Sequence, residues 1–355
     1  MNIKPLKIGN LHVRLPIIQG GMGVGVSLSS LAAAVTNAGG IGVISAADIG
    51  FKEKDFNTNS KAANLRALKE HIKIAKEKTK NGVLGVNIMV VTKDYEDYVK
   101  TAIEAGIDLI ISGAGMPTAL PKIVKDSTVK IAPIISSLKA CRVIMKLWEK
   151  HNNRLPDAVI VEGPKAGGHL GFKKDQINMK EEEFEAEVVK IIDHVKEYEE
   201  KYNTQIPVLV AGGVFDGNDI AKYLKLGASG VQMATRFVAT DECDASDDFK
   251  NAYLNSTIDD VEIVSSPVGM PGRAILNDFV KRTKEGKIKV ERCYDCMIPC
   301  NPADTPYCIT QALINSVTGN IDNGLVFCGE NAHRIKEIVP VQKLMDSLEK
   351  EVLEA

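Results

Sequence analysis

The feature that most constrains the fold of this 355-residue chain is a regular alternation of short apolar runs with amphipathic stretches. Eight β-branched or apolar runs have the length of a buried strand, and each is followed by a turn rich in Gly, Ser, Pro or Asn. They occupy residues 16–19, 41–44, 83–87, 108–111, 130–135, 157–161, 207–210 and 230–233. Between them, apolar residues recur at the spacing of a one-sided helix, as Leu31, Ala34, Val35 and Ala38 do. The pattern predicts parallel strands joined by helical crossovers.

Such strand and helix units can close into a barrel or form a doubly wound open sheet. The polar and glycine residues consistently follow the strands, and eight units are the number that a closed barrel needs. The sequence therefore predicts an α/β fold of the TIM type, a (β/α)8 barrel.

The alternation stops near residue 240, which predicts a barrel core over 1–240 and a C-terminal extension over 241–355 packed on it. Within the extension we expect an irregular stretch over 261–280, a cysteine-rich segment and a final amphipathic helix. That helix is predicted from the apolar residues Val341, Leu344, Met345, Leu348 and Val352.

Composition and charge exclude several classes of protein. No apolar run reaches the roughly 20 residues that cross a bilayer, and the N-terminus lacks the apolar core of a secretory signal. The net charge is -2 and the pI about 6.3, so no global positive field attracts nucleic acid or anionic lipid. We expect a soluble, cytoplasmic protein with a small-molecule partner, and the sequence leaves a homo-oligomer open.

Two glycine-containing loops predict a phosphate site. In barrels of this kind, the loops after the seventh and eighth strands commonly bind phosphate through backbone N–H groups. Here those loops contain Gly212, Gly213, Ala234 and Thr235. Glycine lets the main chain approach an anion without a Cβ in the way, and the threonine adds a hydroxyl donor.

His169 is the candidate catalytic residue, because it lies in a glycine-rich loop shortly after the sixth strand, where barrel enzymes place their chemistry. An imidazole with an ordinary pKa near 6.5 can be neutral at cytosolic pH and accept a proton from a carbon acid. The other five histidines lie in polar sequence that predicts exposed or structural roles: His12, His71, His151, His194 and His333.

Together these segments resemble the nitronate monooxygenase family, formerly called 2-nitropropane dioxygenases, and the related FMN-dependent enoyl-acyl-carrier-protein reductases. The resemblance runs from about Ile17 to Arg273. It is carried by IIQGGMG at 17–23, NAGGIGVIS at 37–45, GVNIMV at 85–90, ISGAGMP at 111–117, VEGPKAGGHLG at 161–171, VLVAGGV at 208–214 and VQMATRF at 231–237.

The resemblance implies an FMN site. It places Gly21, Met22 and Asn87 at the flavin ring, with Glu162 and Gly168 near it, and it assigns the FMN phosphate to Gly212, Gly213, Ala234 and Thr235. Two residues depart from the family pattern, since Lys165 stands where an acidic residue is common and Ala234 where glycine is common. The second change keeps the backbone N–H that phosphate needs, whereas the first alters the charge on the substrate side.

The resemblance also implies the chemistry. In the monooxygenases, FMN oxidises an alkyl nitronate and passes the electrons to oxygen, which yields a carbonyl compound and nitrite. In the reductases, NAD(P)H reduces FMN, which then reduces an enoyl thioester. We favour the monooxygenase on PVGMPGRAI at 267–275 and on the long cysteine-bearing tail. A flavin-binding protein without this catalysis, and other FMN barrels such as hydroxy-acid oxidases, remain as alternatives.

The seven cysteines are an odd number, with five of them between Cys293 and Cys328. This distribution argues against a secreted disulfide framework. The spacing of Cys293, Cys296 and Cys300, followed by Cys308 and Cys328, could bring thiolates to one zinc or iron–sulfur centre. It matches no specific metal motif, and Cys308 lies in YCITQAL, which predicts the buried face of a helix, so we expect reduced thiols and no metal.

Overall fold

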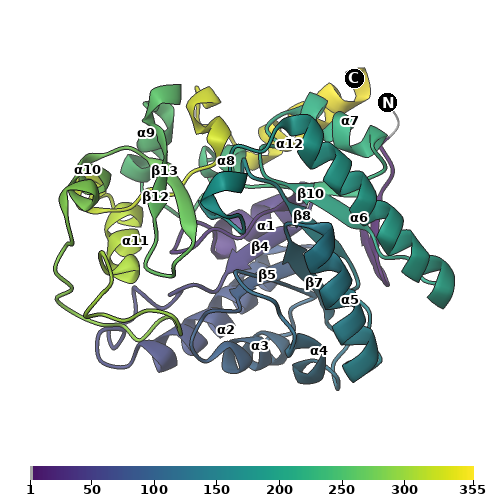
Figure 1. Ribbon diagram of the computed structural model, residues 1–355, viewed down its shortest axis with the longest axis horizontal. Helices are drawn as coiled ribbons and strands as arrows, with labels where there is room; N and C mark the ends of the chain where they lie inside the picture. The colour runs from purple at the N-terminus through teal and green to yellow at the C-terminus, as the bar shows by residue number, and fades with distance from the viewer. Residues whose placement is uncertain (1–2) are drawn as a thin grey trace.

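Eight parallel strands form one sheet that closes on itself (Figure 1). The computed structural model describes residues 3–355. The strands lie in the order β3-β11-β10-β8-β7-β6-β5-β4, and a parallel bridge between Ile18 and Ile41 joins the two end strands. They are β3 (Ile17–Gln19), β4 (Gly42–Ser45), β5 (Leu84–Met89), β6 (Leu109–Gly113), β7 (Lys130–Ile135), β8 (Val159–Glu162), β10 (Val208–Ala211) and β11 (Gly230–Met233). The predicted TIM-type barrel is confirmed, and each of the eight predicted runs overlaps one of these strands.

Helices on the outside connect the strands, and several begin where a polar side chain caps the first turn. The side chains of Asn59, Ser137 and Asp216 accept hydrogen bonds from first-turn N–H groups of α2, α5 and α7. The connecting helices are α1 (Ser29–Asn37), α2 (Ser60–Lys78), α3 (Tyr95–Glu104), α4 (Leu120–Ile123), α5 (Leu138–Asn152), α6 (Glu181–Tyr202) and α7 (Gly217–Lys225).

The core has two parts. One fills the barrel interior with side chains such as Ile18, Leu109 and Leu209, and the other lies between the strands and the outer helices. An antiparallel hairpin of β1 (Leu6–Ile8) and β2 (Leu11–Val13) packs on the interior cluster. The interior is therefore solid, and the C-terminal ends of the strands remain for a site.

The final helix, α12 (Val341–Glu354), packs against α1 and α7 and takes the place of an eighth barrel helix (Figure 1). The predicted apolar stripe is confirmed, since all five of its residues are buried: Val341, Leu344, Met345, Leu348 and Val352. The predicted division of the chain at residue 240 stays a prediction.

The expected irregular stretch over 261–280 is wrong, because it contains an antiparallel hairpin of β12 (Val261–Ser265) and β13 (Pro271–Ile275). A two-residue strand from the barrel, β9 (Gly168–His169), pairs with β13. Pro267, Gly269 and Gly272 interrupt the alternation of apolar and polar residues from which strands are predicted. The third strand of this sheet, β9, is also distant in sequence from the hairpin.

The rest of the chain after β11 is helical or irregular. The helices are α8 (Thr235–Val238), α9 (Asp247–Leu254), α10 (Asp278–Glu285) and α11 (Ile309–Val317), and the short 3₁₀ turns are η2 (Ile258–Asp260), η3 (Ile321–Asn323) and η4 (Glu330–Arg334). One further 3₁₀ turn, η1 (Lys174–Gln176), lies earlier in the chain, between β9 and α6. Cys308 does not lie on the buried face of a helix as predicted, since it is the partly buried N-cap residue before α11. Over residues 3–355, no helix is both long and apolar enough to span a membrane.

Candidate functional site

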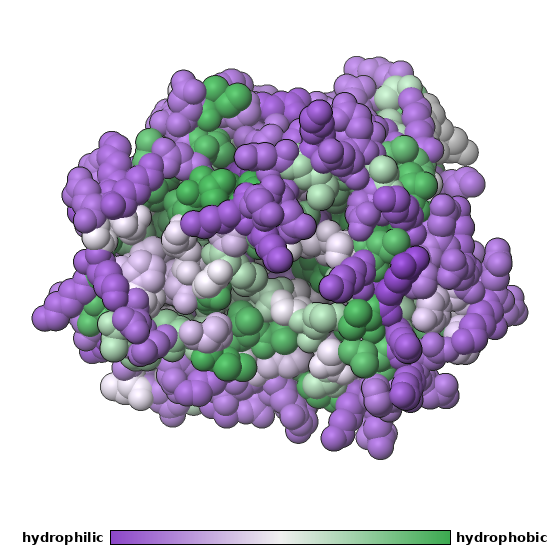
Figure 2. Space-filling view, in the orientation of Figure 1, coloured by the Kyte–Doolittle hydropathy of each residue, from purple (hydrophilic) through white to green (hydrophobic). Residues whose placement is uncertain are grey.

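A cavity of about 450 Å³ lies at the C-terminal ends of the barrel strands. The face of the molecule in Figure 2 is hollowed near its middle, where apolar and weakly polar side chains are rimmed by hydrophilic ones. All the residues that the sequence singled out for catalysis or cofactor binding line this one cavity: Gly21, Met22, Asn87, Glu162, Gly168, His169, Gly212, Gly213, Ala234 and Thr235. The structure brings them together, and their individual roles stay predictions.

One end of the cavity is built from the loops after β10 and β11. Gly212 and Gly213 have φ angles of +87° and +91°, the left-handed region that favours glycine. Neither of their N–H groups meets a protein acceptor in the described chain. A Cβ on Gly212 would lie 2.7 Å from the carbonyl oxygen of Gly163, so a larger residue does not fit. This end offers unpaired backbone donors to an anion.

A strap from the C-terminal part of the chain, residues 327–331, covers this end. The Nδ2 of Asn331 donates to the carbonyl oxygen of Gly213 at 2.7 Å. A Cβ on Gly329 would lie 2.5 Å from Oγ1 of Thr235, so the strap passes directly over the threonine hydroxyl. This end of the cavity is therefore covered on its outer side.

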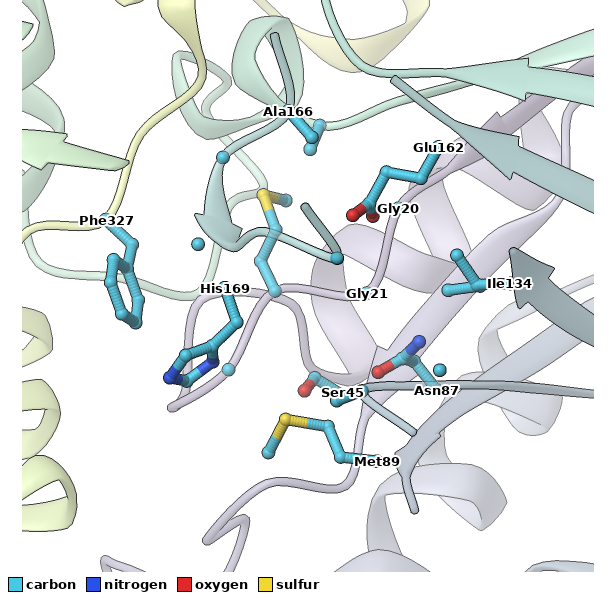
Figure 3. Close-up of a pocket in the computed structure, with 18 of the residues that line it drawn as sticks. Gly20, Gly21, Ser45, Asn87, Met89, Ile134, Glu162, Ala166, His169 and Phe327 are labelled. Atoms are coloured by element: carbon cyan, nitrogen blue, oxygen red, sulfur yellow. The ribbon is translucent and has the colours of Figure 1, made fainter. Parts of the chain in front are cut away.

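The wall across the barrel is made by the loops after β3 and β4 and by the end of β5. A Cβ on Gly21 would lie only 2.3 Å from Cβ of Asn87, so glycine is required where the asparagine packs. Ser45 lies beside them, as Figure 3 shows. This wall gives amide and hydroxyl groups to the cavity.

Two polar groups in the cavity lack protein partners, one on the partly buried Glu162 and one on Gln232. Glu162 has no hydrogen-bond partner in the described residues, and burial raises the pKa of its carboxyl to about 7. The Oε1 atom of Gln232 is also buried without a partner. Both residues pair in register with Ala211, Glu162 on β8 and Gln232 on β11, so they lie at the same level on the two strands that flank β10. Buried polar groups without partners point to a polar ligand.

His169 faces the same space from the other side (Figure 3). Its Nε2 lies 2.6 Å from Oγ of Ser266, and its ring meets Phe327 edge-on at 5.1 Å between centroids. Burial lowers the pKa of the imidazole to about 4. The ring is therefore uncharged at neutral pH, and Nδ1 has no hydrogen-bond partner within residues 3–355.

The loop that carries His169 is held by the β12–β13 hairpin. Gly272 pairs with His169, and the N–H of Leu170 donates to the carbonyl oxygen of Pro271 at 2.8 Å. Arg273 is buried and donates through Nη1 to the carbonyl oxygens of Pro164 and Ala166, at 2.8 and 2.5 Å. The hairpin thus fixes the loop at both ends.

Lys165, the departure noted in the sequence, is paired with carboxylates. Its Nζ lies 2.8 Å from Glu181 and 3.9 Å from Glu330, and its stem packs over Gly213. Sequence reasoning missed Ser266, Phe327 and Gln232 as site residues. Gln232 lies in the quoted VQMATRF segment, whereas nothing local marks the other two, because the fold brings them from distant segments.

The exposed or structural roles expected of the other five histidines stay a prediction, and these residues differ in burial. His12 and His151 are exposed, but His71, His194 and His333 are partly buried. His71 is within 3.0 Å of the Ser29 hydroxyl, and Nε2 of His194 is buried without a partner. All seven cysteines are free, and the described residues contain no group of three or more His, Cys, Asp or Glu side chains placed to hold a metal ion.

A family model described as nitronate monooxygenase matches residues 4–351. The chain belongs to the nitronate monooxygenase family. It is therefore an oxidoreductase of a flavin-dependent family, as the motifs predicted. A probable nitronate monooxygenase of Staphylococcus haemolyticus is 29% identical and aligns with 97% of this chain and 95% of the relative.

Other similar proteins have names that describe different activities. An indene-carboxyl-CoA dehydrogenase of Mycobacterium tuberculosis is 29% identical over 78% of this chain and 67% of its own length. The structure of FabK from Thermotoga maritima matches with a TM-score of 0.73 and 28% identity, covering 96% of this chain and 94% of that one. A nitroalkane oxidase from Streptomyces ansochromogenes has a TM-score of 0.71 over 97% of both chains, and its 21% identity supports the fold alone.

Proposed function

We propose that this family member is an FMN-dependent oxidoreductase that oxidises alkyl nitronates with oxygen to carbonyl compounds and nitrite. The observation that carries the proposal is that an uncharged imidazole, two polar side chains without protein partners and the glycine loop after β10 share one cavity. The family membership supports the same reaction class.

FMN fits the residues present. The N–H groups of Gly212 and Gly213, with those of the first turn of α8 and the Thr235 hydroxyl, would hold its phosphate. Because residues 327–331 close this end, a terminal phosphate fits better than a dinucleotide. Glu162, Gln232 and Asn87 would meet the polar atoms of the flavin. When bound, FMN supplies the acceptor for an electron pair from the substrate.

His169 would orient the nitronate rather than create it. With a pKa of about 4, the imidazole is a weak base at neutral pH, so proton abstraction from a neutral nitroalkane is disfavoured. The Ser266 hydroxyl accepts a long hydrogen bond, 3.4 Å, from the N–H of Val268, so it can donate to Nε2. The imidazole proton then lies on Nδ1 and can be donated to an oxygen of the anionic nitro group.

Anaerobic mixing tests the proposal. We expect ethyl nitronate to bleach the FMN-loaded protein, and His169→Asn to slow that bleaching by roughly 10²-fold while FMN remains bound. The absorbance of the flavin is followed in a stopped-flow instrument. Bleaching by NADH or NADPH but not by the nitronate would refute the proposal, and an unchanged rate in the variant would remove His169 from the mechanism.

The second candidate is NAD(P)H-dependent reduction of an enoyl thioester by the same cavity. It is favoured by the Mycobacterium tuberculosis relative, because the substrate in that protein's name is a carboxyl-CoA, which is a thioester. In this reaction His169 would hydrogen-bond the thioester carbonyl. Steady oxidation of NADH or NADPH that depends on added crotonyl-CoA would support it.

A further inference from the structure

One wall of the cavity is apolar, and the proposed function leaves it unassigned. We call it the apolar wall, and its side chains are Val24, Met89, Met297, Ile309, Leu313, Leu325 and Phe327. We propose that the apolar wall restricts the substrate to nitronates with an uncharged hydrocarbon tail and rejects nitronates that carry a carboxylate on the tail. This inference rests on the proposed function and names the substrate class within it.

The apolar wall is a packed surface. All of its side chains pack in one hydrophobic cluster. Backbone bonds hold its position, because Thr92 and Met297 form an antiparallel bridge and the N–H of Ile298 donates to the carbonyl oxygen of Val91 at 2.9 Å. Met297 and Leu313 are each only 8% exposed, so little of either side chain is open to solvent. The wall therefore offers a preformed apolar face to a ligand.

The apolar wall lies next to the proposed reacting centre. Phe327 meets the ring of His169 edge-on at 5.1 Å between centroids. In the view of Figure 3, the His169 ring lies between Phe327 and Met89. A nitronate whose nitro group is bound by His169 therefore has apolar side chains beside its tail. Each methylene buried against such a wall should strengthen binding roughly threefold to fourfold.

The cavity offers no free positive charge to an anionic tail. Among the described residues that line it, Lys165 is the only lysine or arginine, and the imidazole of His169 is uncharged at neutral pH. Lys165 already pairs with Glu181 at 2.8 Å and lies 3.9 Å from Glu330, and its stem packs over Gly213 and not on the apolar wall. A carboxylate on the tail would lose its water without gaining a countercharge.

A buried carboxyl group, that of Asp48, adds to this selection. Asp48 lines the cavity and is 9% exposed, and its Oδ2 accepts a hydrogen bond at 2.7 Å from the hydroxyl of Thr310, which follows Ile309 of the wall. Burial raises the pKa of Asp48, and hydrogen bonds from Thr310 and Asn64 lower it by less. An ionised Asp48 repels an anionic tail, and a protonated one supplies no positive charge. Neither state favours a carboxylate.

Steady-state kinetics of the FMN-loaded enzyme test the selection with two nitronates of equal length. The nitronates of 1-nitropentane and 5-nitropentanoate differ only in a terminal methyl or carboxylate group. We expect kcat/KM for the pentane nitronate to be at least about tenfold higher, because the buried carboxylate is unpaired. We also expect kcat/KM to rise roughly threefold per methylene from nitroethane to 1-nitropentane. A smaller ratio, or no dependence on chain length, would overturn the inference.

A charge placed in the apolar wall should reverse the preference. Met297→Lys introduces an ammonium group on a side chain of similar length, so kcat/KM should rise at least about tenfold for the carboxylate nitronate and fall for the pentane nitronate. The matched control is Ile298→Lys, which puts the same charge on a neighbouring residue that is 69% exposed and does not line the cavity. It should leave both values at wild-type levels. Equal effects of the two substitutions would contradict a role of the wall.

A binding measurement separates this inference from the proposed function. Calorimetric titration of the FMN-loaded protein with heptan-1-ol and with heptanoate requires no turnover, and we expect the alcohol to bind at least about tenfold more tightly. If the alcohol is preferred but no nitronate is oxidised, the proposed reaction is wrong and selection by the wall is supported. If nitronates are oxidised but heptanoate binds as tightly as the alcohol, the reaction is supported and the inference is wrong.

Discussion

Glu162 shows how burial alone changes the chemistry of one side chain. The carboxyl has no protein partner in the described chain, so nothing offsets the loss of water around its charged form, and its pKa rises to about 7. The folded protein therefore holds a proton on Glu162 that the unfolded chain, with an ordinary pKa of 4.5, has already released. Folding and protonation are linked at this residue.

We predict that Glu162→Gln stabilises the flavin-free protein at alkaline pH. Because the folded-state pKa is raised, wild-type stability falls as pH increases from 4.5 to about 7, and the full penalty remains above that range. The gain should be on the order of 3 kcal/mol at pH 8 and should shrink toward zero near pH 4. Urea unfolding at the two pH values measures it.

The control is Glu182→Gln, on an exposed part of α6. This variant should change stability by less than about 0.5 kcal/mol at either pH. If Glu162→Gln gave the same increment at both pH values, the raised pKa would not be the cause.

At the scale of elements, the sequence predicted what is periodic and missed what depends on distant pairing. The strands of the barrel and the stripe of α12 follow local patterns, and each was predicted within a few residues. The β12–β13 hairpin was not predicted, because Pro267 and Gly269 are residues typical of a loop. The strand that pairs with the hairpin, β9, contains only Gly168 and His169. Consequently the sequence identified His169 but not Ser266, which positions it.

Arg273 is the residue through which this hairpin holds the His169 loop. It satisfies the carbonyl oxygens of Pro164 and Ala166, and its Nη2 lies 3.4 Å from Glu330 in the strap that covers Gly213. We predict that Arg273→Met increases amide hydrogen exchange over residues 163–170 and weakens flavin binding by at least about tenfold, because two buried carbonyl groups lose their donors. Mass-resolved exchange and flavin titration measure the two effects.

Arg282→Met provides the matched comparison. Arg282 also donates to a backbone carbonyl, that of Asp322 at 2.7 Å, but it lies on exposed α10 away from the cavity. Hydrogen exchange over 163–170 and flavin affinity should both stay at wild-type values in this variant. Equal effects of the two substitutions would mean that Arg273 acts on general stability and not on the loop.

At the scale of the whole molecule, the last helix connects the C-terminal segment to the barrel. The predicted extension over 241–355 includes α12, which packs between α1, near the N-terminus, and α7, which precedes β11. Its Glu351 also accepts a hydrogen bond at 2.7 Å from the N–H of Gly217, the first residue of α7. The sequence pattern could predict the helix but not its neighbours. The apolar stripe indicates which face of the helix is buried, but it does not indicate which elements cover that face.

We therefore predict that Leu348→Ala lowers the stability of the entire barrel in one step. Leu348 is fully buried, and removing its side chain should cost about 2–5 kcal/mol. Because α12 completes the ring of helices, far-ultraviolet circular dichroism and the fluorescence of buried Trp148 should report the same shifted urea midpoint. Val143→Ala, at an exposed site on α5, should move that midpoint little. Loss of helix signal at a lower urea concentration than loss of the Trp148 signal would instead show that the C-terminal part unfolds separately from the barrel.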